Sequence, residues 1–155
     1  MSEANVRDNL AVLRRIQLFR GLDDEHLRQI ADTTQFRESE PNEVLARRGE
    51  IGQEMVVIVD GTVRVEVDDK ILTRLGPGEF FGEISLIDGK PRTATVITET
   101  PSTLLTIPHA EFDTLLDSVP QISKRLLKNL ADTLRERTDM LEGNRPGLGK
   151  RVFTD

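Results

Sequence analysis

The sequence contains no cysteine, no tryptophan and no tyrosine, and only two histidines among its 155 residues. Without cysteine the chain forms no disulfide, binds no zinc through thiolates and has no cysteine nucleophile. His26 and His109 cannot supply a three-histidine metal site, and a site of histidine and carboxylate ligands would need both of them. These absences argue against most thiol and metal chemistry.

Positive charge and long hydrophobic runs are also scarce. The 21 Lys and Arg residues are outnumbered by 27 Asp and Glu, which gives a net charge of −6. Such a chain is a poor general partner for nucleic acid, although a local basic patch remains open. No apolar stretch approaches the roughly 20 residues that span a bilayer, and the N-terminus lacks a signal-peptide pattern. The sequence therefore predicts a cytoplasmic, single-domain protein that contacts neither nucleic acid nor membrane.

Helical periodicity is present at both ends of the chain. Apolar residues repeat every three or four positions over residues 5–16, and Asp23 is placed to cap a second short helix. Near the C-terminus the same pattern predicts a short helix at 111–116 and a long one from Pro120 to about Leu141. The apolar stripe of the long helix consists of Ile122, Leu126, Leu127, Leu130, Leu134 and Leu141.

Short apolar runs separated by glycine-rich turns occupy the middle of the chain. Residues 55–59 form a continuous apolar run and residues 63–67 alternate, so Asp60-Gly61 is predicted to join two strands as a hairpin. Further strands are expected at 71–75, 93–98 and 103–107. Many short strands of this kind indicate a mainly β sandwich or barrel with flanking α-helices. The predicted order is helices at 5–33, a β barrel at 34–108, helices at 109–142 and a flexible tail at 143–155.

The residue types that carry chemistry gather in residues 80–96. A short helix is predicted to begin at Gly82, where free backbone N–H groups favour an anion. Arg92 follows ten residues later, and its planar guanidinium matches phosphate oxygens; the Thr93 hydroxyl adds a donor. Glu83 should repel an anion, unless the ligand also carries a sugar hydroxyl that donates to the carboxylate. Together these residues indicate a nucleotide or a sugar phosphate.

Residues 82–86, Gly-Glu-Ile-Ser-Leu, followed by residues 91–96, Pro-Arg-Thr-Ala-Thr-Val, closely resemble the phosphate-binding cassette of cyclic nucleotide-binding domains. This family includes the regulatory subunits of cyclic-AMP-dependent kinase, cyclic-nucleotide-gated channels and the bacterial catabolite activator. The resemblance covers roughly residues 16–141. It implies a β jelly-roll (double-stranded β-helix) barrel with N-terminal helices and C-terminal lid helices, forming a single domain over residues 1–142. It also implies a sensor that binds a cyclic nucleotide, without catalysis, metal or cofactor.

The resemblance implies a role for each residue of the cassette. Glu83 would accept a hydrogen bond from the ribose 2′-hydroxyl and Arg92 would pair with the cyclic phosphate. Backbone amides from the turn of Gly82, Glu83, Ile84 and Ser85 would complete the phosphate site, and the C-terminal helix would close over the base. The alternatives are that Arg92 is a solvated surface arginine, that Glu83 is an exposed carboxylate at a helix start, and that only the backbone of Ser85 matters.

Selectivity for the base depends on fewer residues. In the family, a threonine after the arginine can favour guanine, but bacterial relatives use a hydroxyl there to contact the phosphate, and Thr93 occupies this position. Arg137 and Thr138 fall near the base when Pro120 is aligned with the start of the lid. Arg137 could stack over the purine for about 0.5–2 kcal/mol, or be a solvated helix residue. We expect cyclic AMP rather than cyclic GMP, and core packing for Phe80 and Phe81.

Other functions remain to be weighed against the sensor. A metalloenzyme of the cupin type is disfavoured because both histidines lie outside the predicted β core. A β-barrel interaction module without a ligand is the main alternative. Leu127, Leu134 and Leu141 recur every seven residues, so the helix at 120–141 forms either a homodimer seam or a surface that packs on its own barrel. No output domain is recognised in the sequence, so we expect either an effector protein in trans or a chain that is a piece of something larger.

Overall fold

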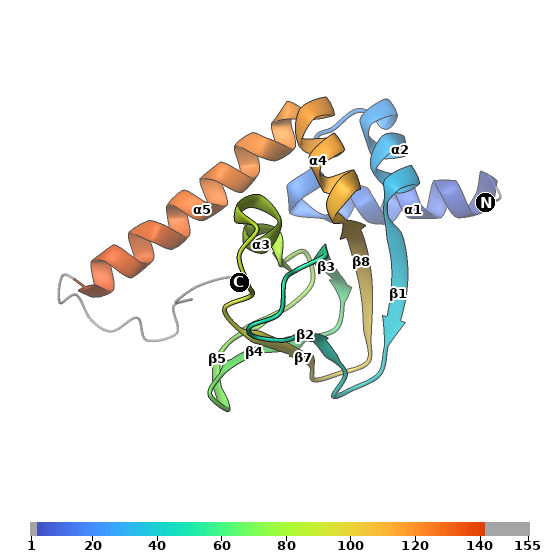
Figure 1. Cartoon of the computed structure of the whole chain (residues 1–155). Helices are drawn as coiled ribbons and strands as arrows, with labels where there is room; N and C mark the ends of the chain where they lie inside the picture. The colour runs from blue at the N-terminus through green and yellow to red at the C-terminus, as the bar shows by residue number, and fades with distance from the viewer. Residues whose placement is uncertain (1–2, 142–155) are drawn as a thin grey trace.

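The computed structural model describes the backbone of residues 3–141 and, within it, the side chains of residues 9–136, 138 and 139. Helices lie at both ends of this range and strands lie between them, in the predicted order (Figure 1). The helices are α1 (Glu3–Arg15), the 3-10 helix η1 (Gln17–Phe19), α2 (Asp24–Thr33), α3 (Glu83–Asp88), α4 (His109–Ser118) and α5 (Pro120–Leu141). The expected tail at 143–155 lies outside the described residues.

The strands form two four-stranded sheets in which every pair is antiparallel. One sheet has the order β1-β8-β3-β6 and the other has the order β2-β7-β4-β5. The strands are β1 (Gln35–Ser39), β2 (Val44–Ala46), β3 (Glu54–Asp60), β4 (Val63–Val67), β5 (Lys70–Leu75), β6 (Phe80–Phe81), β7 (Thr95–Thr98) and β8 (Ser102–Pro108). The mainly β jelly roll with flanking helices is confirmed.

The strand β3 is buried on both of its faces. Met55 and Val57 belong to the apolar cluster formed with the helices, whereas Val56 and Ile58 belong to the cluster between the two sheets. Side chains of a strand alternate between its faces, so a strand covered on both sides has no polar face. This double burial explains why β3 is a continuous apolar run in the sequence.

The helices pack together as one layer against the outer face of the first sheet. Leu13 of α1, Leu27 of α2 and Phe112 of α4 share a cluster with Ile107 of β8. The start of α2 is fixed by Asp23, whose side chain accepts a hydrogen bond from the backbone N–H of His26 at 2.9 Å. The predicted N-cap of α2 is therefore confirmed. The helical layer combines helices that precede the strands with α4, which follows them.

The predicted hairpin between residues 55–59 and 63–67 is wrong. β3 pairs with β6 and β8, whereas β4 pairs with β5 and β7, so the turn at Asp60-Gly61 carries the chain from one sheet to the other. Gly61 has a φ of 97°, and a Cβ there would lie 2.2 Å from Oγ of Ser102. The turn is thus pressed against the start of β8, which leaves no room for a larger residue.

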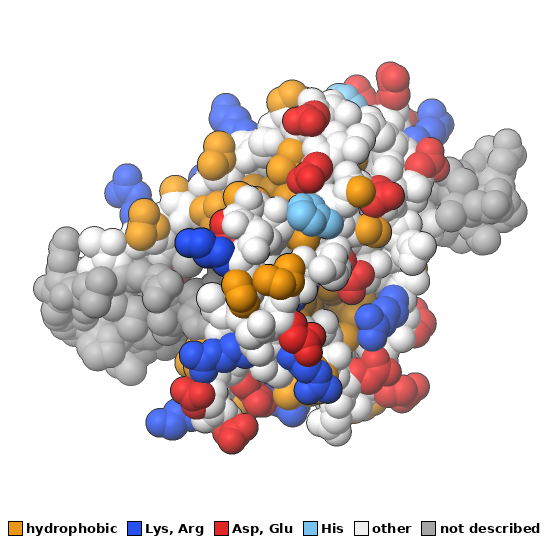
Figure 2. Space-filling model, in the orientation of Figure 1, with side chains coloured by type: hydrophobic (Ala, Val, Ile, Leu, Met, Phe, Trp, Pro, Cys, Tyr) orange, Lys and Arg blue, Asp and Glu red, His pale blue; other side chains and the backbone are white. Residues whose placement is uncertain are grey.

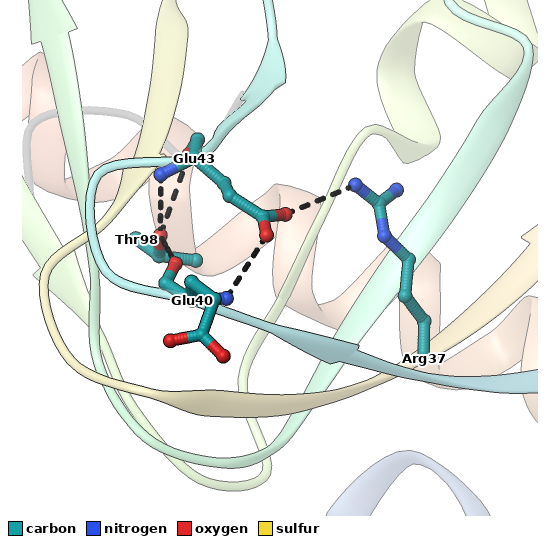
Figure 3. A network of polar contacts seen from close by, with 4 residues as sticks. All are labelled: Arg37, Glu40, Glu43 and Thr98. Atoms are coloured by element: carbon teal, nitrogen blue, oxygen red, sulfur yellow. Dashed lines mark hydrogen bonds and ion pairs between the residues drawn. The ribbon is translucent and has the colours of Figure 1, made fainter.

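A polar network attaches the β1–β2 connection to β7 (Figure 3). The buried Thr98 hydroxyl donates to the Glu40 carbonyl oxygen at 2.6 Å and accepts from the Glu43 N–H at 2.8 Å. The Glu43 carboxylate accepts from the Glu40 N–H at 3.0 Å and lies 3.4 Å from Arg37 Nη2. The backbone hydrogen bond from Glu40, helped by Ser39 and Arg37, holds the pKa of Glu43 below its ordinary value.

The long helix α5 begins beside α4 and extends away from the barrel (Figure 1). Its predicted apolar stripe divides into two parts. Ile122 and Leu126 are buried in the helical layer, but Leu127 and Leu134 are 67% and 66% exposed. In this arrangement those two leucines do not pack on the barrel. Among the described residues, no helix has both the length and the apolar character that crossing a bilayer requires.

Candidate functional site

The predicted cassette is a sharp turn followed by a short helix. β6 ends at Phe81, Gly82 forms the N-cap of α3 with a φ of 95°, and Glu83 is the first helical residue. A Cβ at Gly82 would lie 2.8 Å from Nη1 of Arg92 and 2.8 Å from the Glu54 carbonyl oxygen. Glycine is therefore needed at this position both for its backbone conformation and for the close approach of the arginine.

Arg92 is buried, although it carries a charge. Its side chain and backbone leave only 7% of the residue exposed, which excludes the alternative of a solvated surface arginine. Nη2 donates a hydrogen bond to the Glu54 carbonyl oxygen at 2.9 Å. The backbone is fixed as well, since its N–H donates to the Glu50 carbonyl oxygen at 2.8 Å and its own carbonyl oxygen accepts from Gly49 at 2.9 Å. A guanidinium has five N–H donors, which a single carbonyl oxygen does not occupy.

Two further polar side chains of α3 are buried beside this turn. Glu83 is 0% exposed, so the alternative of an exposed carboxylate at a helix start is wrong. Ser85 is also buried, and its Oγ has no hydrogen-bond partner among the described residues. Burial of a carboxylate and a hydroxyl costs free energy that hydrogen bonds must offset. The cassette thus places costly polar groups together, as binding sites do.

The loop before β3 closes the cassette from another side. A Cβ at Gly52 would lie 2.9 Å from Cζ of Arg92 and 2.9 Å from Cβ of Ser85. Ile51 forms an isolated antiparallel bridge with Pro91, one residue before the arginine. Sequence reasoning did not assign Glu54 or Gly52 to the site. The signal in the sequence was Gly52, because a glycine can mark a place where another segment approaches the backbone closely. The sequence does not show which segment approaches, so the contact with Arg92 could not be predicted.

The structure brings together some predicted residues and not others. Gly82, Glu83, Ser85 and Arg92 form one buried cluster. Ile84 is half-buried and Thr93 is exposed. Thr138 is exposed on the part of α5 that extends away from the barrel (Figure 1), and the side chain of Arg137 is outside the description. The predicted contacts of the last two residues with a base therefore stay predictions.

The remaining expectations concern the aromatic residues and the histidines. Phe81 is buried between the sheets and Phe80 packs against the helical cluster, as expected for core residues. His26 lies in α2 and His109 begins α4, both outside the β core. In the part of the chain that the structure describes, no three His, Asp or Glu residues are grouped so that they could hold a metal ion.

Comparison with known proteins adds to this geometry. Residues 36–119 match the sequence model of the cyclic nucleotide-binding domain. The chain belongs to this family. The matched range runs from β1 to the end of α4 and contains the whole cassette.

Curated relatives of the chain include channels and kinase subunits. It is 36% identical over 116 residues to a cyclic nucleotide-gated potassium channel of Mesorhizobium japonicum, which covers 75% of this chain and 32% of the channel. It is 30% identical over 142 residues to the cAMP-dependent protein kinase type II regulatory subunit of Drosophila melanogaster, covering 79% of this chain and 37% of the subunit. The chain thus spans about a third of the length of these relatives.

Solved structures of the family share the architecture. The catabolite activator protein of Thermus thermophilus matches with a TM-score of 0.74 and 29% identity, over 81% of this chain and 61% of that one. The second cyclic-nucleotide domain of a kinase regulatory subunit, bound to Sp-2Cl-cAMPS, matches with a TM-score of 0.73 over 86% and 91% of the two chains. Its 22% identity supports the fold alone. The chain thus contains a cyclic nucleotide-binding domain with the jelly-roll fold of these neighbours.

Proposed function

We propose that the protein senses cyclic AMP, in preference to cyclic GMP, through residues 82–85 and Arg92, and that ligand binding repositions α5. The observation that carries the proposal is the buried guanidinium of Arg92, enclosed by Gly52 and Gly82 beside the buried Glu83 and Ser85. A positive charge held in so small a buried space is suited to an anion that enters the same space.

The cyclic phosphate is assigned to Arg92 and the first turn of α3. Charge-assisted hydrogen bonds from a guanidinium are about twice as strong as neutral ones, and its fork can hold two phosphate oxygens. The Ser85 hydroxyl is buried, has no hydrogen-bond partner in the described part of the chain and can donate to a third oxygen. The backbone amides of the Gly82–Ser85 turn, at the start of α3, complete the proposed phosphate site.

The ribose is assigned to the Glu83 carboxylate. A phosphate next to a carboxylate would be repelled, so Glu83 favours a ligand that brings a hydroxyl donor to the same place. The 2′-hydroxyl of a ribose 3′,5′-cyclic phosphate is such a donor, and it distinguishes this ligand from its deoxy analogue. Glu83 thereby selects for a ribonucleotide instead of contributing to phosphate affinity.

The proposed movement of α5 has support in the exposed apolar residues. Leu127 and Leu134 on α5 and Ile87 on α3 are each more than half exposed. Figure 2 shows hydrophobic side chains along α5 and again near the centre of the same face. A closed position of α5 that covers such surface gains about 25 cal/mol for each Å² removed from water. A ligand that binds the closed form better shifts the population toward it.

The preference for cyclic AMP, the partners and the location are parts of the same proposal. The Drosophila relative is a cAMP-dependent protein kinase regulatory subunit, which supports the preference for cyclic AMP. The exposed Leu127 and Leu134 are seven residues apart, which favours a homodimer through α5. An effector protein that acts in trans, in the cytoplasm, completes the proposed role, and no catalysis is proposed.

The test is a calorimetric titration of the full chain with cyclic AMP and with cyclic GMP. We expect a Kd below about 100 μM for cyclic AMP, with weaker binding of cyclic GMP. Arg92→Ala should weaken cyclic AMP at least about 100-fold, because it removes a charge-assisted pair. Arg28→Ala, which removes an exposed arginine of α2, is the matched control and should bind normally. The proposal fails if neither nucleotide binds, or if Arg92→Ala binds as well as the control.

A further inference from the structure

A cavity of about 640 Å³ lies apart from the cassette. It is lined by η1 and Arg20, by the connection between β5 and β6 at residues 78–80, and by one face of α5 between Arg125 and Asp132. No cassette residue is among the described residues that line it. Small-molecule sites have volumes of about 300–1,000 Å³, so the cavity is large enough for a metabolite.

One wall of the cavity is fixed by a cation. The Arg125 guanidinium donates from Nη1 to the Leu18 carbonyl oxygen at 2.7 Å and to the Gln17 carbonyl oxygen at 3.4 Å. These bonds join α5 to η1 across the cavity's edge. The cavity is therefore held open between two elements that are tied together, as a preformed site requires.

Two other cations face the cavity from opposite parts of the chain. Arg20 follows η1 and Lys128 lies on α5, and both side chains are exposed. Neither forms an ion pair with a described residue, whereas Arg14, Arg37, Arg48 and Arg74 elsewhere on the surface do. The lining of the cavity carries three cations, Arg20, Arg125 and Lys128, against the two carboxylates of Glu79 and Asp132, so positive charge outnumbers negative charge there although the chain has a net charge of −6. The cations favour an anionic group in the cavity.

Acceptors line the same cavity. The carboxylate of Glu79 is part of the lining and accepts a hydrogen bond from the Gly76 N–H at 3.1 Å. Asp132 lies one turn further along α5 and is exposed. A simple anion such as inorganic phosphate satisfies the cations but brings no hydroxyl donor to the carboxylates of Glu79 and Asp132, which repel it. An anion that also carries hydroxyl groups satisfies both.

We propose that this cavity binds a small polyhydroxylated anion of the sugar-phosphate class. The phosphate lies between Arg20 and Lys128, and hydroxyl groups donate to the carboxylates of Glu79 and Asp132. Phe80 supplies an apolar surface for the sugar carbons. The two proposals rest on different residues, although one wall of this cavity is α5, the helix that cyclic nucleotide is proposed to reposition.

The test is a heteronuclear NMR titration of the full chain with glucose 6-phosphate, glucose and inorganic phosphate. We expect saturable shifts centred on residues 128–129 with glucose 6-phosphate, with a Kd of about 1 mM or lower. Inorganic phosphate should bind at least about five-fold more weakly, and glucose should cause no saturable shift. Equal binding of phosphate and glucose 6-phosphate would overturn the assigned class of ligand.

Single-residue variants distinguish binding in this cavity from binding in the cassette and from nonspecific electrostatic attraction to the surface. Lys128→Ala and Arg20→Ala should each weaken glucose 6-phosphate at least about five-fold. Lys124→Ala is the matched control, since Lys124 is an exposed lysine one turn earlier on α5 that does not line the cavity. Arg92→Ala should leave the binding unchanged. The inference is wrong if Lys124→Ala weakens binding as much as Lys128→Ala, or if Arg92→Ala abolishes it.

Discussion

Gly52 lies directly against the guanidinium of Arg92, so that a methyl group on its Cα would be 2.9 Å from Cζ and 3.0 Å from Nη2. The two residues are brought together by the backbone pairing of the loop before β3 with the segment before β7. The arginine is therefore positioned by its surroundings before a ligand enters, which lowers the free energy lost to ordering on binding.

The first prediction concerns this contact. Gly52→Ala should displace the arginine, destabilise the fold by about 1–3 kcal/mol through overpacking and weaken cyclic AMP at least about ten-fold. Thermal unfolding and calorimetry measure the two effects. Gly76→Ala is the control, because its Cβ would meet only one atom, the Gly61 carbonyl oxygen at 4.0 Å. Full affinity in Gly52→Ala would show that the arginine does not need its present position.

The second prediction tests whether Glu83 reads the ribose. Cyclic AMP and its 2′-deoxy analogue should differ in affinity by about ten-fold or more for the natural chain, because the deoxy ligand leaves a buried acceptor without its donor. In Glu83→Gln that difference should shrink. Calorimetric titration of both proteins with both ligands forms a double cycle. If the variant discriminates as strongly as the natural chain, Glu83 has another role.

The third prediction concerns the hydrogen bonds that tie α5 to η1. Arg125→Ala removes donors to the Leu18 and Gln17 carbonyl oxygens and so releases α5 from its present position. If this position is the one that ligand binding replaces, cyclic AMP should bind about three- to ten-fold more tightly to the variant. Arg135→Ala, an exposed arginine further along α5, is the control and should bind as the natural chain does. Weaker binding to Arg125→Ala would contradict the proposed movement.

The fourth prediction follows from Glu43. Its pKa is lower in the folded chain than its ordinary value of 4.5, mainly because its carboxylate accepts from the Glu40 backbone. A lowered pKa means that the ionised form stabilises the fold, and this contribution is complete above about pH 4.5 and is lost as the pH falls through the folded pKa. The unfolding temperatures of the natural chain and of Glu43→Gln should therefore differ at neutral pH and converge in acid. If the difference in unfolding temperature between the two proteins stays the same at every pH, ionisation of Glu43 does not stabilise the fold.

Local patterns in the sequence were sufficient for much of the fold and part of the site. The two N-terminal helices, α4, α5 and the short helix after Gly82 depend on periodicity and capping over a few residues, and the structure has all of them. The cassette was found for the same reason, since residues 82–96 are contiguous. Its central pair, Glu83 and Arg92, is buried as a ligand site requires.

Contacts between distant segments were beyond the reach of such patterns. An alternating strand and an apolar run identify two strands but not their partners, so β3 and β4 were wrongly paired across Asp60-Gly61. The Glu54 carbonyl oxygen that holds Arg92 belongs to the backbone and leaves no mark on residue type. Burial of Leu127 and Leu134 was one of two open alternatives, because an apolar stripe does not say which surface covers it.

The position of β3 limits how far a signal from the cassette has to travel. Its first residue, Glu54, holds Arg92 through its carbonyl oxygen, and the next residue, Met55, already belongs to the cluster that packs the helices. A ligand that pulls on the guanidinium therefore acts on a strand whose other face touches the helical layer. In the proposed mechanism, the cassette and the helical layer are therefore separated by the thickness of one β-sheet.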